Sequence, residues 1–450
     1  MAITVIGAGL AGCEAAWAAA QQGEPVILWE MKPEKFTPAH RSVGFAELVC
    51  SNSLKARRLE SAAGLLKEEM RRLGSLCVPV ALACSVPAGG ALAVDRDVFS
   101  ATITEKIRSH PLITVKQGEV TDIPAEGVVV IATGPLTSQP LADAIAALCG
   151  GGLSFYDAAA PIVTAESVDM TSAFRASRYD REESGEGDYI NCPLNKEEYE
   201  TFREALITAE TAPLHAFDRA EGLTVYEGCM PIEVLAARGG DAIRFGPMKP
   251  VGLRDPHTGH RPWAVVQLRA ENAAGTLYNL VGFQTNLKFG EQKRVFGMIP
   301  ALKNAEFMRY GVMHRNTFLN APTLLDGAFR LKSRPDLLFA GQMTGVEGYM
   351  ESAASGLLAG LNAVRQVRGQ QPLILPRDTM LGALAGHVCD ENAHYQPMGA
   401  NFGILPSLDV PIRDKKQRYA ALAQRALDSL ARVTATMEET LPDLTEREDI

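Results

Sequence analysis

The chain lacks several features that would place it in a class at once. None of its apolar runs approaches the roughly 18 residues that span a bilayer, so we expect no membrane segment. No basic stretch precedes the first apolar run, as it would in a secretory signal, so we expect a cytoplasmic protein. The eight cysteines form no CxxC pair, and no cluster has metal-ligand spacing. These absences predict reduced thiols and no bound metal.

An excess of positive charge is also missing, since the formal net charge at pH 7 is −9. The segment 437–450 holds six acids against Arg447, a net of −5, so the rest of the chain carries only −4. Short clusters of lysine and arginine are scattered along the chain and are typical of a solvated surface. Composition therefore neither indicates nor excludes a nucleic-acid partner.

The first thirty residues carry the most informative pattern. An apolar run enters a GxGxxG turn, an alanine-rich helical segment follows, and a second apolar run ends in Glu30. In a dinucleotide-binding βαβ unit, these glycines make the turn, admit a pyrophosphate and let helix and strand pack closely. The helix N-terminus favours phosphate through its free N–H groups and its dipole. We expect the cofactor to contact this turn, which consists of Gly7, Ala8, Gly9, Leu10, Ala11 and Gly12.

The acid at the end of the second apolar run indicates which dinucleotide binds. Glu30 lies 18 residues beyond Gly12, where a carboxylate can accept hydrogen bonds from a ribose. The same charge would repel a ribose phosphate, which favours FAD or NAD over NADP. A merely tight strand–helix turn is the alternative, and it leaves Glu30 unexplained.

Two later segments indicate the rest of a flavin fold. Residues 128–131 form an apolar β-branched run that leads into Ala-Thr-Gly, where Gly134 allows close approach to a ligand. Residues 338–366 supply a strand, a glycine-bearing turn and a long helix, and another packed strand–helix unit is the alternative there. We expect this turn to hold the flavin end of FAD through Gly341, Gln342, Gly348, Tyr349 and Met350.

The order of these patterns predicts an α/β chain with a Rossmann-type FAD-binding domain interrupted by an inserted α+β domain. We expect the FAD-binding domain in residues 1–160 and 326–450, the second part ending in a helix and an acidic tail, and the inserted domain in 161–325. We also expect a short helix from Phe45 that carries Cys50, and a strand over Val78 to Val86. No second GxGxxG follows, so a nicotinamide donor would bind only transiently.

Two cysteines lie among polar and turn residues, unlike the others. Cys50 occurs in ELVCSNSLK, close to Lys55, and Cys229 occurs in YEGCMPIEVLAARG, just before a helix start at Pro231. A cation or a helix N-terminus can lower the pKa of a thiol and so make it nucleophilic. A small, inert hydrophobic residue is the alternative for either cysteine.

Long motifs along the chain resemble one family. The segments VIGAGLAGCEAAW, FAELVCSNSLK, YEGCMPIEVLAARG, GFQTNLKFGEQKRVFGMIPALKNAEFMRYGVMHRNTF and FAGQMTGVEGYMESAASGLLAG together look like the folate- and FAD-dependent tRNA (uracil-5-)-methyltransferase family, TrmFO. The resemblance runs from Ile3 to about Gln366. A related family, which modifies the tRNA wobble uridine with an aminomethyl group, shares the FAD domain but has an extra C-terminal helical domain.

The resemblance implies methylation at C5 of the T-loop uridine (tRNA position 54). It implies methylenetetrahydrofolate as one-carbon donor and FAD reduced by NADPH or NADH. It also implies two working cysteines: a thiolate that adds to C6 of uracil activates C5, and a base removes the C5 proton. We expect Cys229 to be the nucleophile and Cys50 to act as base or protect the flavin, and the reverse assignment stays open. Polar candidates for folate are Asn286, Lys288, His314 and Arg315.

Other functions fit parts of the same pattern. A flavin-dependent oxidoreductase acting on a small metabolite, or a wobble-uridine enzyme, would use the same FAD domain. A non-enzymatic FAD- and tRNA-binding module would need neither thiol. The tRNA would have to splay its target base out of the loop. The sequence does not determine the oligomeric state.

Overall fold

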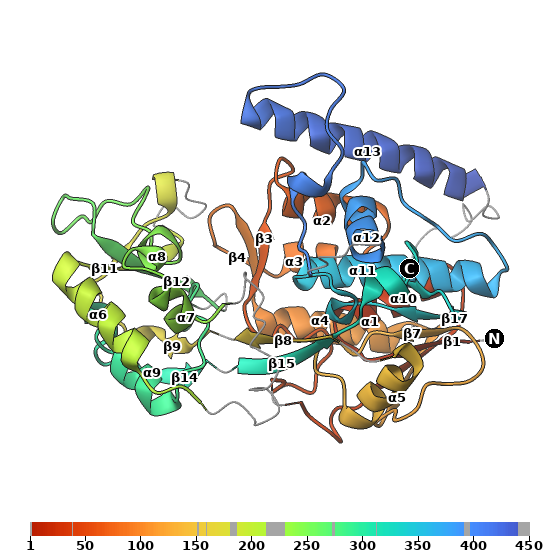
Figure 1. Ribbon diagram of the computed structural model, residues 1–450, viewed down its shortest axis with the longest axis horizontal. Helices are drawn as coiled ribbons and strands as arrows, with labels where there is room; N and C mark the ends of the chain where they lie inside the picture. The colour runs from red at the N-terminus through yellow and green to blue at the C-terminus, as the bar shows by residue number, and fades with distance from the viewer. Residues whose placement is uncertain are drawn as a thin grey trace.

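The computed structural model describes residues 2–37, 39–150, 153–158, 160–180, 187–212, 230–271, 275–311, 313–390 and 397–439. The larger half is built on a sheet of order β16-β17-β7-β1-β2-β6 (Figure 1). All neighbouring pairs are parallel except β16 with β17. The strands come from both ends of the chain: β1 Ile3–Ile6, β2 Val26–Glu30, β6 Ile113–Gln117, β7 Val129–Ile131, β16 Arg330–Leu331 and β17 Arg334–Phe339.

Two helices pack so closely that their backbones touch. Helix α1 is Leu10–Gln21 and helix α11 is Tyr349–Val367. A Cβ at Gly356 would overlap the carbonyl of Ala11, and a Cβ at Gly360 would come within 2.5 Å of the carbonyl oxygen of Ala15. This contact brings the glycine turn before α1 and the turn before α11 to one edge of the sheet.

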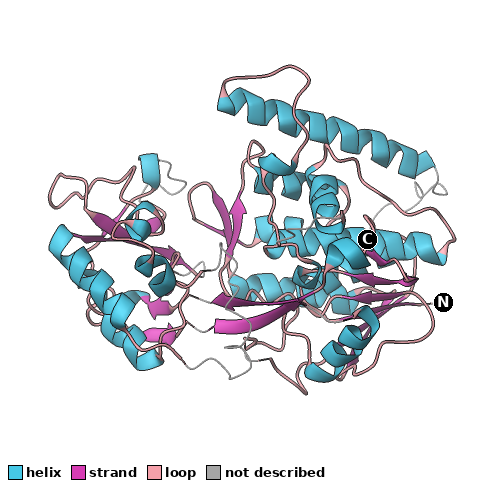
Figure 2. Ribbon diagram, in the orientation of Figure 1, coloured by secondary structure: helices cyan, strands magenta, loops and turns pink. Residues whose placement is uncertain are grey.

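Further helices surround the sheet, and a small sheet, β3-β5-β4, lies beside it (Figure 2). The helices are α2 Ala62–Arg72, α3 Cys77–Ala83, α4 Arg96–Ser109, α5 Gln139–Cys149, α10 Ala321–Leu324, α12 Met380–Cys389 and α13 Lys415–Glu439. The small sheet consists of β3 Ser53–Ala56, β4 Ser85–Val86 and β5 Ala91–Val94.

Two local expectations were wrong. The apolar run expected as a strand over 78–86 is mostly helix α3, because Glu14 lies at the start of that helix and accepts hydrogen bonds from the N–H groups of Leu76 and Cys77. The stretch from Phe45 to Cys50 is not helical. Ala46 has φ +49° and donates its N–H to the carbonyl of Ala8 in the glycine turn, so the backbone bonds to the fold and not to itself.

The inserted domain has its own antiparallel sheet and core. Its strand order is β10-β11-β12-β13-β9-β14. These strands are β9 Ile162–Thr164, β10 Phe174–Arg175, β11 Tyr189–Leu194, β12 Ala264–Ala270, β13 Leu277–Leu280 and β14 Phe307–Arg309. A separate apolar cluster packs beneath α6 Lys196–Thr208, α7 Ile232–Ala237, α8 Ala242–Phe245 and α9 Phe289–Phe296.

A two-stranded ribbon joins the halves. Strand β8 (Leu153–Ala158) carries the chain into the inserted domain, and β15 (Met313–Phe318) carries it back. The two strands pair antiparallel with each other and belong to neither large sheet (Figure 1). The expected boundaries at 160/161 and 325/326 therefore assign β8 to the FAD-binding domain and its partner β15 to the inserted domain.

Candidate active site

A cleft opens at the carboxyl ends of the parallel strands, where open α/β sheets bind ligands. It contains about 1150 Å³ of empty space, including the solvent at its mouth. Most residues expected to contact the cofactor line it. They are Gly7, Ala8, Gly9, Leu10, Ala11, Glu30, Gly134, Gly341, Gln342 and Tyr349.

The three glycines of the first turn have different jobs. Gly7 has φ +98°, and a Cβ there would lie 2.7 Å from the carbonyl oxygen of Ala132. A Cβ at Gly12 would overlap the carbonyl of Gly7, so Gly12 serves packing and does not line the cleft. A Cβ at Gly9 would meet no atom within 4 Å, which leaves the backbone open to a ligand. This cradle fits the pyrophosphate of a dinucleotide.

Glu30 is held in place at the cleft wall by backbone groups. Its Oε2 accepts the N–H of Ala8 at 2.9 Å, and its Oε1 accepts the N–H of Lys32 at 3.0 Å. The residue is only 7% exposed, so the carboxylate has a fixed direction. Each oxygen keeps capacity for a further donor, which fits the hydroxyl groups of a ribose.

The second turn contributes only part of what the sequence predicts. Gly341, at φ +83°, donates its N–H to Ser355 Oγ at 2.8 Å, and Gln342 donates to the Glu347 carboxylate at 3.2 Å. Gly348 and Met350 do not line the cleft. Met350 is buried in the core.

Cys50 lies at the rim of the cleft, next to the lining residue Val49, and contacts Tyr349. The Tyr349 hydroxyl oxygen lies 3.0 Å from Cys50 Sγ and accepts the N–H groups of Cys50 at 2.7 Å and Ser51 at 3.2 Å. Tyr349 is the first residue of α11 and itself lines the cleft. One side chain thus connects the expected flavin site with the expected working thiol.

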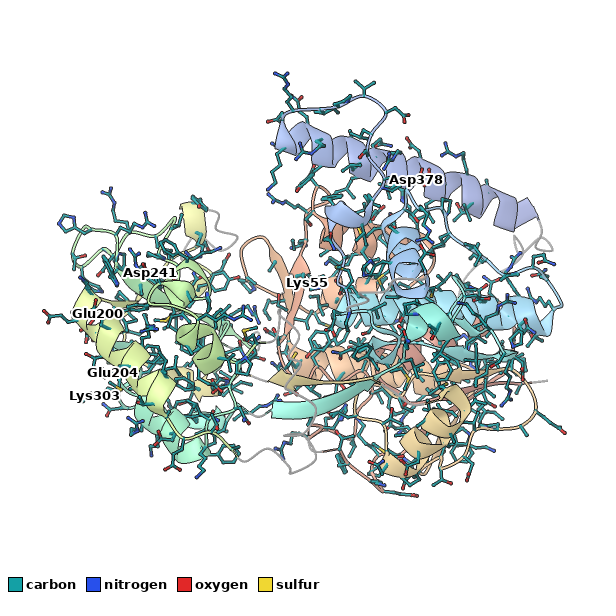
Figure 3. All side chains as sticks on the ribbon, viewed as in Figure 1. Lys55, Glu200, Glu204, Asp241, Lys303 and Asp378 are labelled. Atoms are coloured by element: carbon teal, nitrogen blue, oxygen red, sulfur yellow. The ribbon has the colours of Figure 1, made fainter. Side chains whose placement is uncertain are left out.

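An ion pair joins the same two segments a second time. Lys55, in β3, places its Nζ 2.6 Å from Glu351 Oε1 and 3.3 Å from the carbonyl oxygen of Glu347. Glu351, two residues after Tyr349, is 1% exposed. Figure 3 labels Lys55 on the part of the larger half that faces the inserted domain.

The inserted domain clamps the residues that follow Cys50. Arg269 of β12 donates from Nη2 to Ser51 Oγ at 2.6 Å and from Nε to Asn52 Oδ1 at 2.8 Å. Asn52 in turn donates to the carbonyl of Ala270 at 2.7 Å. Burial lowers the pKa of Arg269, which is 6% exposed. The sequence signal for this residue is an arginine inside an apolar strand, which the sequence analysis does not single out.

The surroundings of Cys50 are mainly cationic. Arg96 of α4 forms an ion pair with Glu271 and donates to the carbonyl of Leu48 at 2.8 Å. Arg309 of β14 is partly buried, and burial followed by repulsion from Arg96 lowers its pKa, while Tyr349 and Cys50 act in the opposite direction. With Arg269, three arginine side chains among the described residues lie around the Cys50 segment, and the buried carboxylate of Glu271 pairs with Arg96. Positive charge near a thiol favours its thiolate.

Cys229, the other expected catalytic residue, lies outside the described residues. The chain resumes at Met230, and the N–H of Ile232 donates to the carbonyl of Gln284 at 2.7 Å. Glu233 accepts the N–H of Asn286 at 2.7 Å and the hydroxyl of Thr285 at 2.9 Å. Burial raises the pKa of Glu233.

Two of the four folate candidates, Asn286 and Lys288, lie outside the cleft lining. The Asn286 side chain donates to the carbonyl of Ala212 at 3.3 Å, and Lys288 pairs with Glu210 at 2.6 Å on the surface. The backbone of His314 and Arg315 lies in β15, and their side chains are outside the described residues.

Within the part of the chain that the structure describes, no helix is both long and apolar enough to cross a membrane. In the same ranges, no group of three or more His, Cys, Asp or Glu side chains could hold a metal ion.

Comparison with known proteins gives consistent matches. Residues 2–371 match the family described as glucose inhibited division protein A. The chain is 59% identical over 438 residues to the methylenetetrahydrofolate--tRNA-(uracil-5-)-methyltransferase TrmFO of Enterococcus faecalis, covering 97% of this chain and 99% of the relative. Identity to the protein of the same description in Geobacter sulfurreducens is 57%, with the same coverage.

A solved structure supports the fold. Aquifex aeolicus GidA superimposes with a TM-score of 0.69 at 17% sequence identity, covering 97% of this chain and 76% of that one. At this identity the likeness concerns the fold alone. It agrees with the expected Rossmann-type sheet interrupted by an inserted domain.

Proposed function

The chain belongs to the TrmFO family of methylenetetrahydrofolate--tRNA-(uracil-5-)-methyltransferases, and we propose that it methylates C5 of a uracil in tRNA with methylenetetrahydrofolate as one-carbon donor. The single observation that carries this proposal beyond a generic flavoprotein is the position of Cys50. A flavin oxidoreductase that acts on a small metabolite would need the cleft but would not need a thiol at its rim. Uracil methylation needs thiol chemistry at that place.

The proposed cofactor is FAD, and the residues of the cleft fit it. Gly7 and Gly9 provide a close backbone approach for the pyrophosphate, Glu30 offers ribose acceptors, and Gly341 with Tyr349 lies at the far end. When bound, FAD supplies the electrons that turn a one-carbon unit into a methyl group. The proposed source of these electrons is NADPH or NADH, and the proposed location is the cytoplasm.

The proposed roles of the cysteines follow from what C5 of uracil requires. Addition of the Cys229 thiolate to C6 forms an S–C bond and moves the ring electrons to C5, which then bonds to the one-carbon unit. Removal of the C5 proton comes next, and Cys50 is the proposed acceptor. Its S–H bond would form as the C–H electron pair displaces the carrier nitrogen from the one-carbon unit. A hydride from reduced flavin to that carbon would then complete the methyl group as the C6–S bond breaks and the C5–C6 double bond returns.

The proposed substrate is the T-loop uridine of tRNA, which must leave its stack to expose C5 and C6. Arg96 and Arg309 carry positive charge near Tyr349 and Cys50, which suits an anionic nucleotide. Binding should weaken with salt, because phosphate contacts release counterions.

The test is incubation with unmodified tRNA, methylenetetrahydrofolate, FAD and NADPH, followed by nucleoside analysis. We expect 5-methyluridine in the T-loop from the wild-type enzyme and none from Cys229→Ala. Cys84→Ala is the matched control, since Cys84 is a partly buried thiol remote from the cleft lining, and it should keep full activity. If the flavin cycles and no 5-methyluridine forms, the proposal is wrong.

A further inference from the structure

The Tyr349 hydroxyl makes three polar contacts, and they define where its proton points. A phenol has one proton and accepts at its oxygen lone pairs. The N–H groups of Cys50 and Ser51 can only donate, so the oxygen accepts both. The remaining contact in the described structure is Cys50 Sγ at 3.0 Å, which must receive the hydroxyl proton.

The hydroxyl remains a donor because it does not ionise near neutral pH. Burial raises the pKa of Tyr349 well above its usual value, and the charge of Cys50 raises it further, while Arg96 lowers it. A thiol ordinarily ionises at lower pH than a phenol, so of these two groups the thiol is the one expected to ionise first. A hydrogen bond to a charged sulfur is stronger than one to a neutral sulfur, so this contact favours the thiolate.

Four described elements contribute to the charge environment of the thiol. Arg96 comes from α4, Arg269 and Glu271 from β12, Arg309 from β14 and Tyr349 from α11. The guanidinium groups favour the thiolate and Glu271 opposes it. Among these groups only the Tyr349 hydroxyl bonds to the sulfur itself, so it sets the geometry as well as the charge.

We propose that Tyr349 is a positioning residue whose hydroxyl donates to Cys50 Sγ and keeps this thiol in its thiolate form, aimed from the rim of the cleft as a proton acceptor. The role as proton acceptor rests on the proposed function. The Tyr349–Cys50 contact does not. The ion pair between Lys55 and Glu351 holds the two segments together and so preserves the contact.

The experiment measures how readily Cys50 is alkylated at different pH values in the FAD-loaded enzyme. Iodoacetamide labelling of the Cys50 peptide, quantified by mass spectrometry, gives the midpoint of thiolate formation. In Tyr349→Phe the ring stays and the donor is lost, so we expect the midpoint to rise by about one pH unit. Labelling near neutral pH should then slow by about tenfold.

Tyr199→Phe is the matched control. Tyr199 is a buried tyrosine of α6 whose hydroxyl donates to the carbonyl of Gly240 at 2.7 Å, so the midpoint for Cys50 should not move. Replacement of all tyrosines by 3-fluorotyrosine keeps every hydroxyl group and should shift the midpoint in the direction opposite to that of Tyr349→Phe. The more acidic phenol donates more strongly, and the midpoint should fall.

The outcomes separate this inference from the proposed function. An unchanged midpoint in Tyr349→Phe overturns it, and if that variant fails to fold, an unchanged midpoint with 3-fluorotyrosine does so. If the midpoint shifts but the wild-type enzyme makes no 5-methyluridine, the proposed function fails and the contact stands. If both hold, the acid limb of the methylation pH profile should move upward in Tyr349→Phe together with the labelling midpoint.

Discussion

The glycine turn (residues 7–12) and the loop that carries Cys50 (residues 45–52, the Cys50 loop) lie at the same cleft but are held in place by different kinds of contact. The turn is formed by one continuous stretch between β1 and α1, and its contacts follow from the glycines themselves. The loop has no regular structure, and Tyr349 and Arg269 hold it from positions far along the chain. A local motif can therefore bind a common cofactor, while the specific chemistry depends on long-range assembly.

The largest expected effect comes from the packing glycine of the turn. In Gly12→Ala the new methyl group overlaps the Gly7 carbonyl, so we expect a loss of about 3 kcal/mol in the free energy of unfolding, together with lost FAD. Gly9→Ala is the control, since its methyl group meets nothing in the protein. The apoprotein should unfold at an unchanged denaturant concentration, while FAD binds on the order of tenfold more weakly. Equal losses of stability in both variants would contradict the assigned roles.

The next effect tests the long-range clamp. Arg269→Met removes the donors to Ser51 and Asn52, so the Cys50 loop loses its support from the inserted domain. We expect methylation to slow by about 10- to 100-fold while FAD content stays unchanged. The control is Arg175→Met, because Arg175 bonds to Tyr278 and not to the loop. If Arg269→Met loses FAD in proportion to its methylation activity, the glycine turn and the Cys50 loop are not independent.

A smaller effect is expected at the ribose site. Glu30→Gln keeps the size of the side chain but loses one acceptor and the charge, so FAD should bind about tenfold more weakly in a fluorescence titration. Glu119→Gln serves as the comparison, since Glu119 also lines the cleft but pairs with the exposed Lys35. An equal weakening in both variants would indicate a general charge effect.

The smallest effect concerns the support behind the Cys50 loop. Lys67 donates to the carbonyl of Leu54 at 2.7 Å, and burial lowers its pKa from 10.5 to about 8, although Glu351 opposes this. The unfolded chain therefore binds more protons between these two values, and the stability of the folded state rises with pH in that window. Relative to Lys67→Met, we expect a gain of about 1 kcal/mol between pH 8 and pH 9 in urea unfolding.

The matched variant for this titration is Lys35→Met. Lys35 is half-exposed and pairs with Glu119 at 2.6 Å, so its removal should leave the shape of the stability–pH curve unchanged. Parallel curves for wild type and Lys67→Met would show that Lys67 stays charged in the folded protein up to pH 9.

Sequence patterns were most informative where the residues that determine a local structure and the residues that adopt it lie in one short segment. The glycine turn and Glu30 fall in thirty consecutive residues, and Gly7 to Ala11 and Glu30 line one cleft, while their contact with the cofactor stays a prediction. Sequence patterns failed where a partner from elsewhere decides the local structure. The run over 78–86 suits a buried strand or a helix equally, and Glu14 settles the choice by accepting two N–H groups of the helix start.

The same limit applies to the candidate site. The polar neighbours of Cys50 distinguish it in the sequence, and the nearby Lys55 is the cation expected to act on it, but Lys55 pairs with Glu351. The residues that do surround the thiol, Arg96, Arg269 and Arg309, come from three different elements. No spacing in the sequence relates them, because the contacts form only when the inserted domain docks.

The sequence by itself determined the dinucleotide cradle and the Rossmann-type order of elements, because glycine sterics and apolar periodicity act between close neighbours in the chain. Only the tertiary structure decided which groups surround Cys50. Tyr349 reaches it across 299 residues of sequence, held there by the close packing of α1 and α11 and by the Lys55–Glu351 pair. Hydrogen bonds and charges act over a few ångströms of space, whatever the distance along the chain.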